Sequence, residues 1–193
     1  MKPNYLKNLW LAASVTIGAM AAVACDDTGL YPAGYPNIVD TTTIYALRMT
    51  PIGTPSAFDI SIGLPVRTDQ GAAFDFAFDI DSLGVAVIFP AGALGLGAEA
   101  GLQLTDKEFD ELDEAPYDKY VTDSVIAVAV DDVFIGRSRN TSGLDGCYYY
   151  GQLPRYGKFH VIELDMQERT LTLEILVNVN CGYRKLEPGY PNY

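Results

Sequence analysis

The sequence predicts an all-β protein: a β-sandwich-like domain, Ig-like or jelly-roll-like, with one short helix and a preceding N-terminal hydrophobic segment. Short runs rich in β-branched and aromatic residues recur at intervals near ten residues, bounded by Pro, Gly or Asp. Hydrophobic residues make up 49% and charged residues 20% of the chain, which is enough apolar material for a packed core. An uncharged apolar run stands apart from these features, close to the first residue.

Residues 1–25 are predicted to be a signal or lipoprotein anchor segment. Lys2 and Lys7 precede an uncharged, mostly apolar run from Leu9 to Ala24. As a helix this run would be about 24 Å long, shorter than the roughly 30 Å hydrocarbon core of a bilayer. A positive start, an apolar middle and small residues at the end are typical of a bacterial export signal.

Three interpretations of the end of this segment remain open. Ala22 to Cys25 reads AVAC and resembles the lipobox of bacterial lipoproteins, although Ala22 replaces the usual Leu; this predicts Cys25 as a lipid attachment site. Ala22 to Ala24 also fits an A-x-A secretory cleavage site. In the third interpretation the segment is retained as a transmembrane anchor.

Two Tyr/Pro-rich segments flank the predicted domain, which covers residues 43–187. Residues 26–42 are predicted to be a tether and residues 188–193 a C-terminal tail, and Gly-Tyr-Pro-Asn occurs in both. Tyrosine is enriched at interfaces because it supplies a large contact area at low entropic cost. We therefore expect the tails to be docking arms, with a possible interface at the tyrosines they contain: Tyr31, Tyr35, Tyr190 and Tyr193.

The strands are expected at 43–49, 57–63, 74–80, 85–89, 123–130, 146–152, 158–165 and 170–179. The pairs 74–89 and 158–179 are predicted hairpins, and the apolar run at 123–130 suits a central strand. In 74–80, phenylalanine alternates with Asp75, Ala77 and Asp79, which predicts an inward phenyl face and outward carboxylates. Thr105 and Glu108 have capping-box spacing, so 105–114 is predicted to be a short helix that packs on the sheet through Phe109 and Leu112.

The residues do not indicate catalysis or a bound cofactor. His160 is the only histidine, so a zinc or copper site of ordinary composition lacks ligands, and no metal or cofactor is expected. Neither a G-x-S-x-G nor an S-x-x-K nucleophile motif is present, nor a lysine-bearing phosphate loop. We expect His160 to be a core-edge residue that hydrogen-bonds to the backbone, with Ile162 and Leu164 on the same side of its strand, and the protein not to be an enzyme.

Charge and cysteine content constrain the partners and the compartment. The formal net charge is −12 and all 25 acidic residues follow Cys25, so nucleic acid is excluded and any membrane contact is expected through the N-terminus. An exported domain with three cysteines is expected to pair Cys147 with Cys181 and leave Cys25 for lipid. That bond would stabilise the fold by roughly 3–4 kcal/mol in the loop-entropy model.

The stretches CYYYGQ at 147–152 and NCGYR at 180–184, in an all-β export domain, resemble a group of small uncharacterised bacterial lipoproteins of unknown function. The resemblance implies the same disulfide and the same fold class. The sequence as a whole predicts a non-enzymatic, membrane-tethered protein on the periplasmic side of the bacterial cell envelope. Its expected role is structural or a protein interaction. The alternative is an accessory subunit of a large photosynthetic or respiratory membrane complex; a carbohydrate-binding module or a hydrolase is a further alternative.

Overall fold

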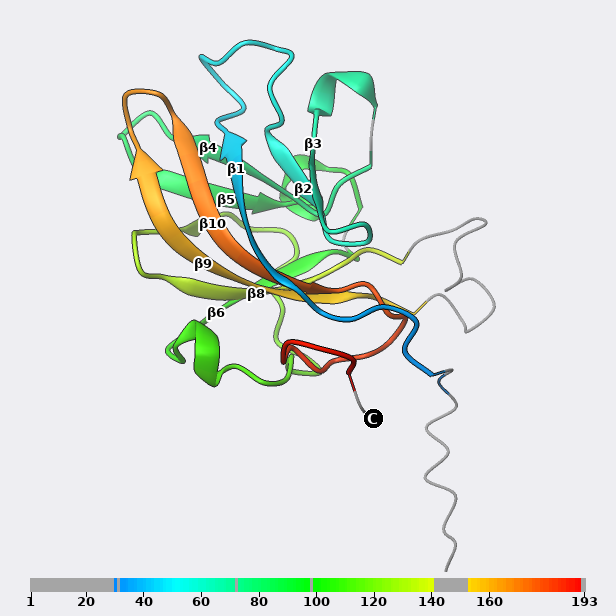
Figure 1. The fold of residues 1–193 in the computed structure, drawn as a ribbon. Helices are drawn as coiled ribbons and strands as arrows, with labels where there is room; N and C mark the ends of the chain where they lie inside the picture. The colour runs from blue at the N-terminus through cyan, green and yellow to red at the C-terminus, as the bar shows by residue number, and fades with distance from the viewer. Residues whose placement is uncertain (1–29, 31, 72, 98, 141–152, 192–193) are drawn as a thin grey trace, which may run out of the picture.

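Two five-stranded antiparallel sheets face each other in this computed structural model, which describes residues 30, 32–71, 73–97, 99–140 and 153–191 (Figure 1). The first sheet has the order β1–β10–β9–β8–β6 and the second β3–β2–β4–β5–β7. The strands of the first sheet are β1 (Val39–Tyr45), β6 (Gly101–Thr105), β8 (Val133–Arg137), β9 (Tyr156–Asp165) and β10 (Thr170–Asn178). Those of the second are β2 (Ala57–Asp59), β3 (Leu64–Val66), β4 (Phe76–Ile80), β5 (Ala86–Pro90) and β7 (Ile126–Ala127). The predicted all-β sandwich class is confirmed.

The space between the sheets is filled by aromatic rings from both. Phe58 and Phe76 of the second sheet contact Phe159 of the first, with ring centroids 5.3 and 5.2 Å away. Phe134 stacks on Phe159 at 4.9 Å, and all four side chains are fully buried. Edge-to-face and stacked pairs of this kind add to the hydrophobic energy of burial. Phe76 and Phe78 of the predicted inward face are therefore part of this core, whereas Phe74, which precedes β4, is buried in a separate cluster with Ala57 and Ala77.

The strands β4 and β5 form the predicted hairpin. Its turn is closed by Asp81, whose Oδ1 accepts hydrogen bonds from the N–H groups of Leu83 and Val85 at 2.8 and 2.9 Å. Gly84 has φ +80°, a conformation that suits glycine. The second predicted hairpin is formed by β9 and β10.

The outward placement predicted for the carboxylates of 74–80 is wrong. Asp75 and Asp79 are only 1% and 2% exposed. Arginines from distant segments cover them, so the alternation of apolar and acidic residues does not mark a solvent-facing side here. Strand periodicity alone cannot distinguish water from an arginine as the partner of a carboxylate.

The central strand predicted at 123–130 is also wrong. Only Ile126–Ala127 are in a strand, β7, which lies at an edge of the second sheet. The chain turns at 129–132, where Asp132 Oδ2 accepts the N–H of Ala129 and Asp131 adopts φ +74°. Strand β8 lies inside the first sheet, and sequence analysis did not identify it.

The short helix predicted at 105–114 is a single 3-10 turn, η3 (Phe109–Glu111). Thr105 Oγ1 accepts the N–H of Lys107 at 3.2 Å, so it closes a local turn and does not cap a longer helix. Phe109 and Leu112 are buried, as expected, in a second apolar cluster with residues of β8, β9 and β10. Two further 3-10 turns occur in the described chain, η1 (Thr68–Gln70) and η2 (Ala91–Leu94).

Candidate interaction surface

The two Tyr/Pro segments meet at the end of the first sheet where β1 begins and β10 ends (Figure 1). The N–H of Asn37 donates to the carbonyl of Gly189 at 2.7 Å, and the N–H of Gly189 donates back at 2.9 Å. This reciprocal pair is an isolated antiparallel bridge. We term residues 34–38 and 180–191, held together in this way, the terminal clasp.

Asparagine side chains fix the backbone of the clasp. Asn180 Oδ1 accepts the N–H groups of Gly34 and Tyr35 at 2.8 and 3.1 Å, and its Nδ2 donates to the Tyr35 carbonyl at 2.8 Å. Asn37 Nδ2 donates to the carbonyls of Lys185 and Glu187. An amide has both donors and an acceptor, so asparagine satisfies irregular backbone that no strand can pair.

Two of the four predicted interface tyrosines, Tyr35 and Tyr190, therefore lie on backbone that is held in place at this end of the domain. Tyr35 and Tyr190 are each 65% exposed although their segments are hydrogen-bonded to the body. Tyr31 and Tyr193 lie outside the described residues, as does the predicted strand at 146–152. The described parts of the two tails are not free arms, because backbone bonds join them to each other. β1 also begins at Val39, inside the range predicted as a tether.

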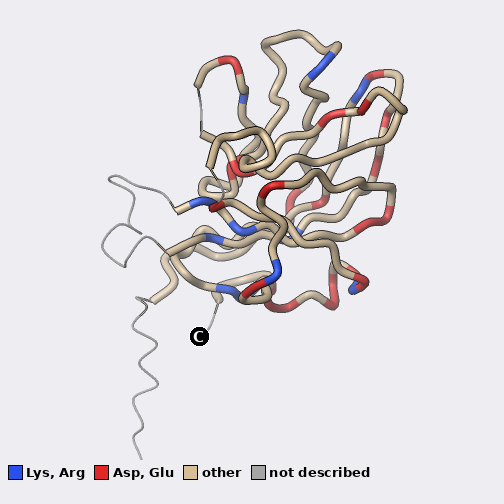
Figure 2. The backbone as a smooth tube through the Cα atoms, turned by 180° about the vertical axis from the view of Figure 1, so that it is seen from behind, with Lys and Arg blue, Asp and Glu red and all other residues tan. Residues whose placement is uncertain are grey.

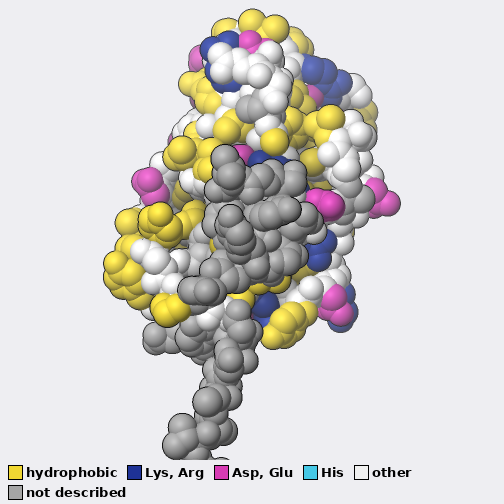
Figure 3. All heavy atoms as spheres, turned by 90° about the vertical axis from the view of Figure 1, so that its right-hand side faces the viewer, with side chains coloured by type: hydrophobic (Ala, Val, Ile, Leu, Met, Phe, Trp, Pro, Cys, Tyr) yellow, Lys and Arg dark blue, Asp and Glu magenta, His cyan; other side chains and the backbone are white. Residues whose placement is uncertain are grey.

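A groove of about 340 Å³ opens beside the clasp. It lies where the space between the sheets reaches the surface, and apolar side chains are exposed on the side of the molecule seen in Figure 3. Its lining is Tyr35, Pro36, Ile38, Asp40, Ile62, Gly63, Ile175, Val177 and Val179. Ile38 and Ile62 are 68% and 53% exposed, so the groove presents apolar surface to solvent. Asp40 is the one lining residue with a charge.

Acidic positions lie on turns across the body, with basic positions interspersed (Figure 2). Several of the basic residues form ion pairs with buried carboxylates and do not line the groove. Asp40 is therefore the charge that the groove presents. An anion is a poor ligand for such a surface. An apolar or cationic group is a better one.

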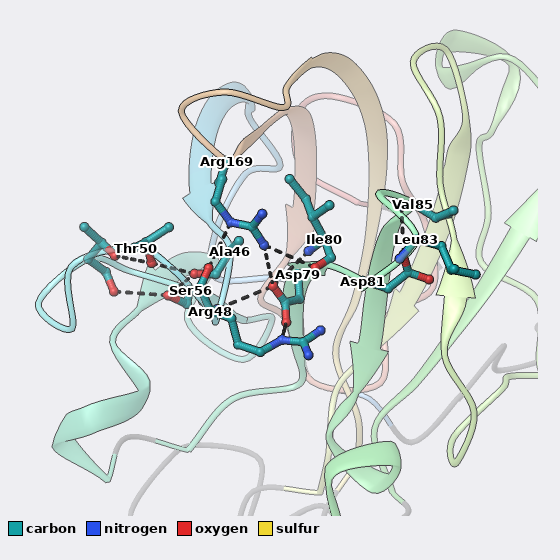
Figure 4. A network of polar contacts seen from close by, with 11 residues as sticks. Ala46, Arg48, Thr50, Ser56, Asp79, Ile80, Asp81, Leu83, Val85 and Arg169 are labelled. Atoms are coloured by element: carbon teal, nitrogen blue, oxygen red, sulfur yellow. Dashed lines mark hydrogen bonds and ion pairs between the residues drawn. The ribbon is translucent and has the colours of Figure 1, made fainter.

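One buried carboxylate is enclosed by two arginines at the opposite end of β1 (Figure 4). Asp79 accepts hydrogen bonds from Arg48 Nε at 2.5 Å and from Arg169 Nη2 at 3.3 Å. Arg169 also donates to the carbonyls of Arg48 and Ile80. This distal network ties the 46–56 loop and the β9–β10 turn to β4.

A second buried cluster has the opposite ratio of charges. Arg139 donates to both Asp59, at 2.9 Å, and Asp75, at 3.0 Å. Burial raises the pKa of Asp75 to about 6, and the nearby Asp59 acts in the same direction, against Arg139 and the backbone N–H groups that favour the charged form. The cluster joins the end of β8 to β2 and β4, and so holds the sheets together.

His160 lies at a core edge, but its polar partner is a side chain. Its Nδ1 is 3.2 Å from Glu174 Oε2, and Asp131 Oδ1 is 3.8 Å from Nε2. A bulge in β9 opposite Thr172 and Leu173 interrupts the alternation after Val161, so the side predicted to be shared with Leu164 is wrong: Leu164 packs against the main core. In the described part of the chain, no three His, Cys, Asp or Glu residues gather as a metal site.

The lipid and disulfide predictions fall mostly outside the described residues. Cys25 and Cys147 are among the residues that are not described, and Cys181 lies half-buried just after β10. The pairing of Cys147 with Cys181 and lipid attachment at Cys25 therefore stay predictions. Within the described ranges, no helix is long and apolar enough to span a bilayer.

No protein-family model and no curated protein matches this chain. The clasp was missed as a structure because its signal is two separated asparagines, Asn37 and Asn180, whose backbone partners Glu187 and Tyr35 are 150 and 145 residues away. The recurrence of Gly-Tyr-Pro-Asn in both tails was the available hint. Identical short motifs do not by themselves reveal that they pair.

Proposed function

We propose that the protein is a non-enzymatic, membrane-tethered component of the bacterial cell envelope that works by contacting another protein. The observation that carries this proposal is the terminal clasp. It fixes the backbone at Tyr35 and beside Tyr190 while leaving both side chains mostly exposed, and Tyr35 lines an apolar groove. Aromatic side chains on a backbone that is already ordered lose little conformational entropy when they bind a partner, which favours an interface role.

The tether follows from the sequence alone. Leu30 comes only a few residues after Cys25. A lipid on Cys25 would hold Gly34, the first residue of the clasp, within about 32 Å of the bilayer, since Gly34 is nine residues further on and an extended residue spans at most about 3.6 Å. In this proposal Cys147 pairs with Cys181, which closes the chain near the same end.

Mass spectrometry of the protein purified from bacterial membranes tests the tether. We expect an N-terminal peptide that begins with diacylated or triacylated Cys25. An intact Met1 would instead indicate a retained anchor, and an unmodified Ala24–Cys25 cleavage product in the soluble fraction would overturn the tether. Non-reducing digestion of the same sample is expected to yield one peptide pair linked through Cys147 and Cys181.

Substitution of the exposed tyrosines tests the contact role. Tyr35→Ala together with Tyr190→Ala is expected to release the protein from a high-mass complex in native membrane extracts, with the melting temperature nearly unchanged. Leu83→Ala is the control, because Leu83 is 86% exposed on the β4–β5 turn, which follows Ile80 of the distal network and lies away from the clasp. Equal retention of all three proteins would contradict the assignment of this surface.

A further inference from the structure

The outer edge of β1 carries backbone groups that no strand in the described part of the chain uses. β1 pairs only with β10, as the first strand of its sheet. The N–H of Tyr45 donates to the carbonyl of Pro55, away from β10, whereas the N–H of Ala46 donates to Arg169, next to β10. Because the direction alternates along an antiparallel strand, the outward-pointing residues are Val39, Thr41, Thr43 and Tyr45.

Two further contacts agree with this assignment. The N–H of Thr41 donates to Asp40 Oδ1 at 2.7 Å and not to β10. The hydroxyl groups of Thr43 and Thr172 approach to 3.1 Å, as expected for a pair without backbone hydrogen bonds. In the described ranges, no backbone group pairs with the outward N–H and C=O groups of Val39, Thr41 or Thr43.

This edge is accessible over its first half. Val39 is 41% exposed, and Asp40 and Thr41 are exposed as well. Unpaired edges of this kind bind extended chains by main-chain hydrogen bonds, and charged side chains are the usual protection against unwanted pairing. Asp40 is the charge here, and it lines the groove.

The groove and the edge belong to one surface. Asp40 is opposite Ile175 in the β1–β10 ladder, and both line the groove. The alternation of β1 puts Asp40 on the same face as Ile44, which is buried in the core. A strand added outside β1 would therefore direct every second side chain toward the groove, where it meets apolar residues and the Asp40 carboxylate.

We propose that β1 receives an extended peptide strand from a partner protein, with apolar side chains over the groove and a basic side chain beside Asp40. This inference rests on the proposed contact function, because it names the binding mode of that same surface. Charge selects the occupant: Asp40 is the one charged residue lining the groove and the chain carries a formal charge of −12, so a second copy or an anionic lipid surface is electrostatically disfavoured. A cationic, alternating peptide would pair with the outward backbone groups, replacing Asp40 Oδ1 as the acceptor of the Thr41 N–H, and would place its basic side chain beside the Asp40 carboxylate.

Amide hydrogen exchange on the full chain in lipid nanodiscs tests the proposal. The probe is the capped synthetic peptide Val-Thr-Lys-Thr-Val-Thr-Val, whose alternate side chains are apolar or basic. At saturating peptide we expect slower exchange at the amides of Val39, Thr41 and Thr43. The amides of Asp40, Thr42 and Ile44 already face β10 and should change little. No added protection, or equal protection at both sets, would overturn the proposal.

Two controls distinguish the addition of a peptide strand from nonspecific peptide binding. The variant Thr41→Pro removes an outward N–H without removing a bond to β10, and it should weaken peptide binding about tenfold or more, whereas Thr41→Val should bind like the parent. The same peptide N-methylated on the residues facing β1 tests the claim without altering the protein. Replacing its Lys by Glu should also weaken binding; unchanged binding by the N-methylated or Glu peptide would contradict the mode proposed.

Other occupants give different results. Slowed exchange at Val39, Thr41 and Thr43 without peptide, together with a dimer in sedimentation, would show that a second copy occupies the edge and would overturn the proposal. Slowed exchange at the same three amides in nanodiscs but not in detergent would show that lipid contacts the edge, and this would also overturn the proposal. Because the lipid on Cys25 and the effect of the Tyr35 and Tyr190 substitutions are measured separately, failure of the peptide test leaves those results intact and rejects only the binding mode.

Discussion

Asp75 directly precedes β4 and Asp79 lies within it, and both side chains are buried. The charges around the two carboxylates nevertheless differ. Asp79 has two arginines, Arg48 and Arg169, from two loops at the distal end. Asp75 shares the single Arg139 with a second carboxylate, Asp59. The first cluster has more positive than negative charge, and the second has the reverse.

The difference shows that burial does not decide what a carboxylate contributes. A buried ion pair stabilises only when the attraction and the hydrogen bonds offset the loss of hydration. Asp79 keeps a cation if either arginine is lost, whereas Asp59 and Asp75 both depend on one residue. The Arg139 cluster is therefore the more fragile joint between the two sheets.

The largest effect is expected for Arg139→Met. It leaves two carboxylates buried near each other with no cation, and a broken buried pair of this type costs about 3–5 kcal/mol. Urea denaturation followed by circular dichroism would measure the free energy of unfolding. A loss no greater than that of Arg48→Met would break the comparison.

A smaller effect is expected for Arg169→Met, because Asp79 retains Arg48. The side chain of Arg169 is 16% exposed and donates to the Arg48 and Ile80 carbonyls as well as to Asp79. Loss of these bonds should lower the free energy of unfolding by about 1–3 kcal/mol. The same titration measures it, and a value equal to that of Arg139→Met would remove the distinction between the clusters.

The pH dependence of stability should come from Asp75. Its folded-state pKa of about 6 exceeds the unfolded value of about 3.9, so the folded state binds the proton more tightly. The charged carboxylate is thus a destabilising contribution above pH 6 that is relieved as the pH falls. Relative to Asp75→Asn, the parent protein should gain about 1 kcal/mol between pH 7 and pH 5. A difference that stays constant over this range would contradict the assignment.

The smallest effect is expected for Arg48→Met. The Arg48 side chain is 60% exposed, so water screens its interaction with Asp79, and Arg169 remains in contact. We expect a loss of at most about 1 kcal/mol, readable as a small shift of the urea midpoint. A loss of several kcal/mol would mean that Arg48, and not Arg169, holds the distal network together.

The sequence predicted what depends on local periodicity and missed what depends on distant partners. Phe76 and Phe78 gave the correct inward face, and Asp81 to Gly84 gave the correct turn, because both signals lie within a few residues. Phe74 was misplaced, because it precedes β4 and packs with Ala77 in another cluster. Asp75 and Asp79 were misplaced, because the arginines that cover them come from residues 31 to 90 positions away. β8 was missed because its Gly136 weakens the strand pattern, although an added Cβ there would lie 2.5 Å from Ile60 Cδ1.

For the candidate site, the sequence predicted which residues take part and not how they are arranged. Tyr35 and Tyr190 stood out as aromatic residues in proline-rich tails, and both are exposed in the structure. Their convergence through Asn37, Gly189 and Asn180 depends on hydrogen bonds to irregular backbone, which leave no periodic trace in a sequence. The free edge of β1 likewise follows from the sheet order, since strand propensity says nothing about which strand is outermost.

The clasp also makes the chain suitable for circular permutation, in which the original ends are joined and new ends are opened elsewhere. Because Asn37 and Gly189 are hydrogen-bonded to each other, a short linker between the flanking segments would connect them without distorting the sandwich. New ends could then be opened at the exposed turn around Leu83, at the tip of the β4–β5 hairpin. A reporter domain fused there would project from a hairpin tip, whereas one fused after Pro191 would sit beside the bridge between Asn37 and Gly189.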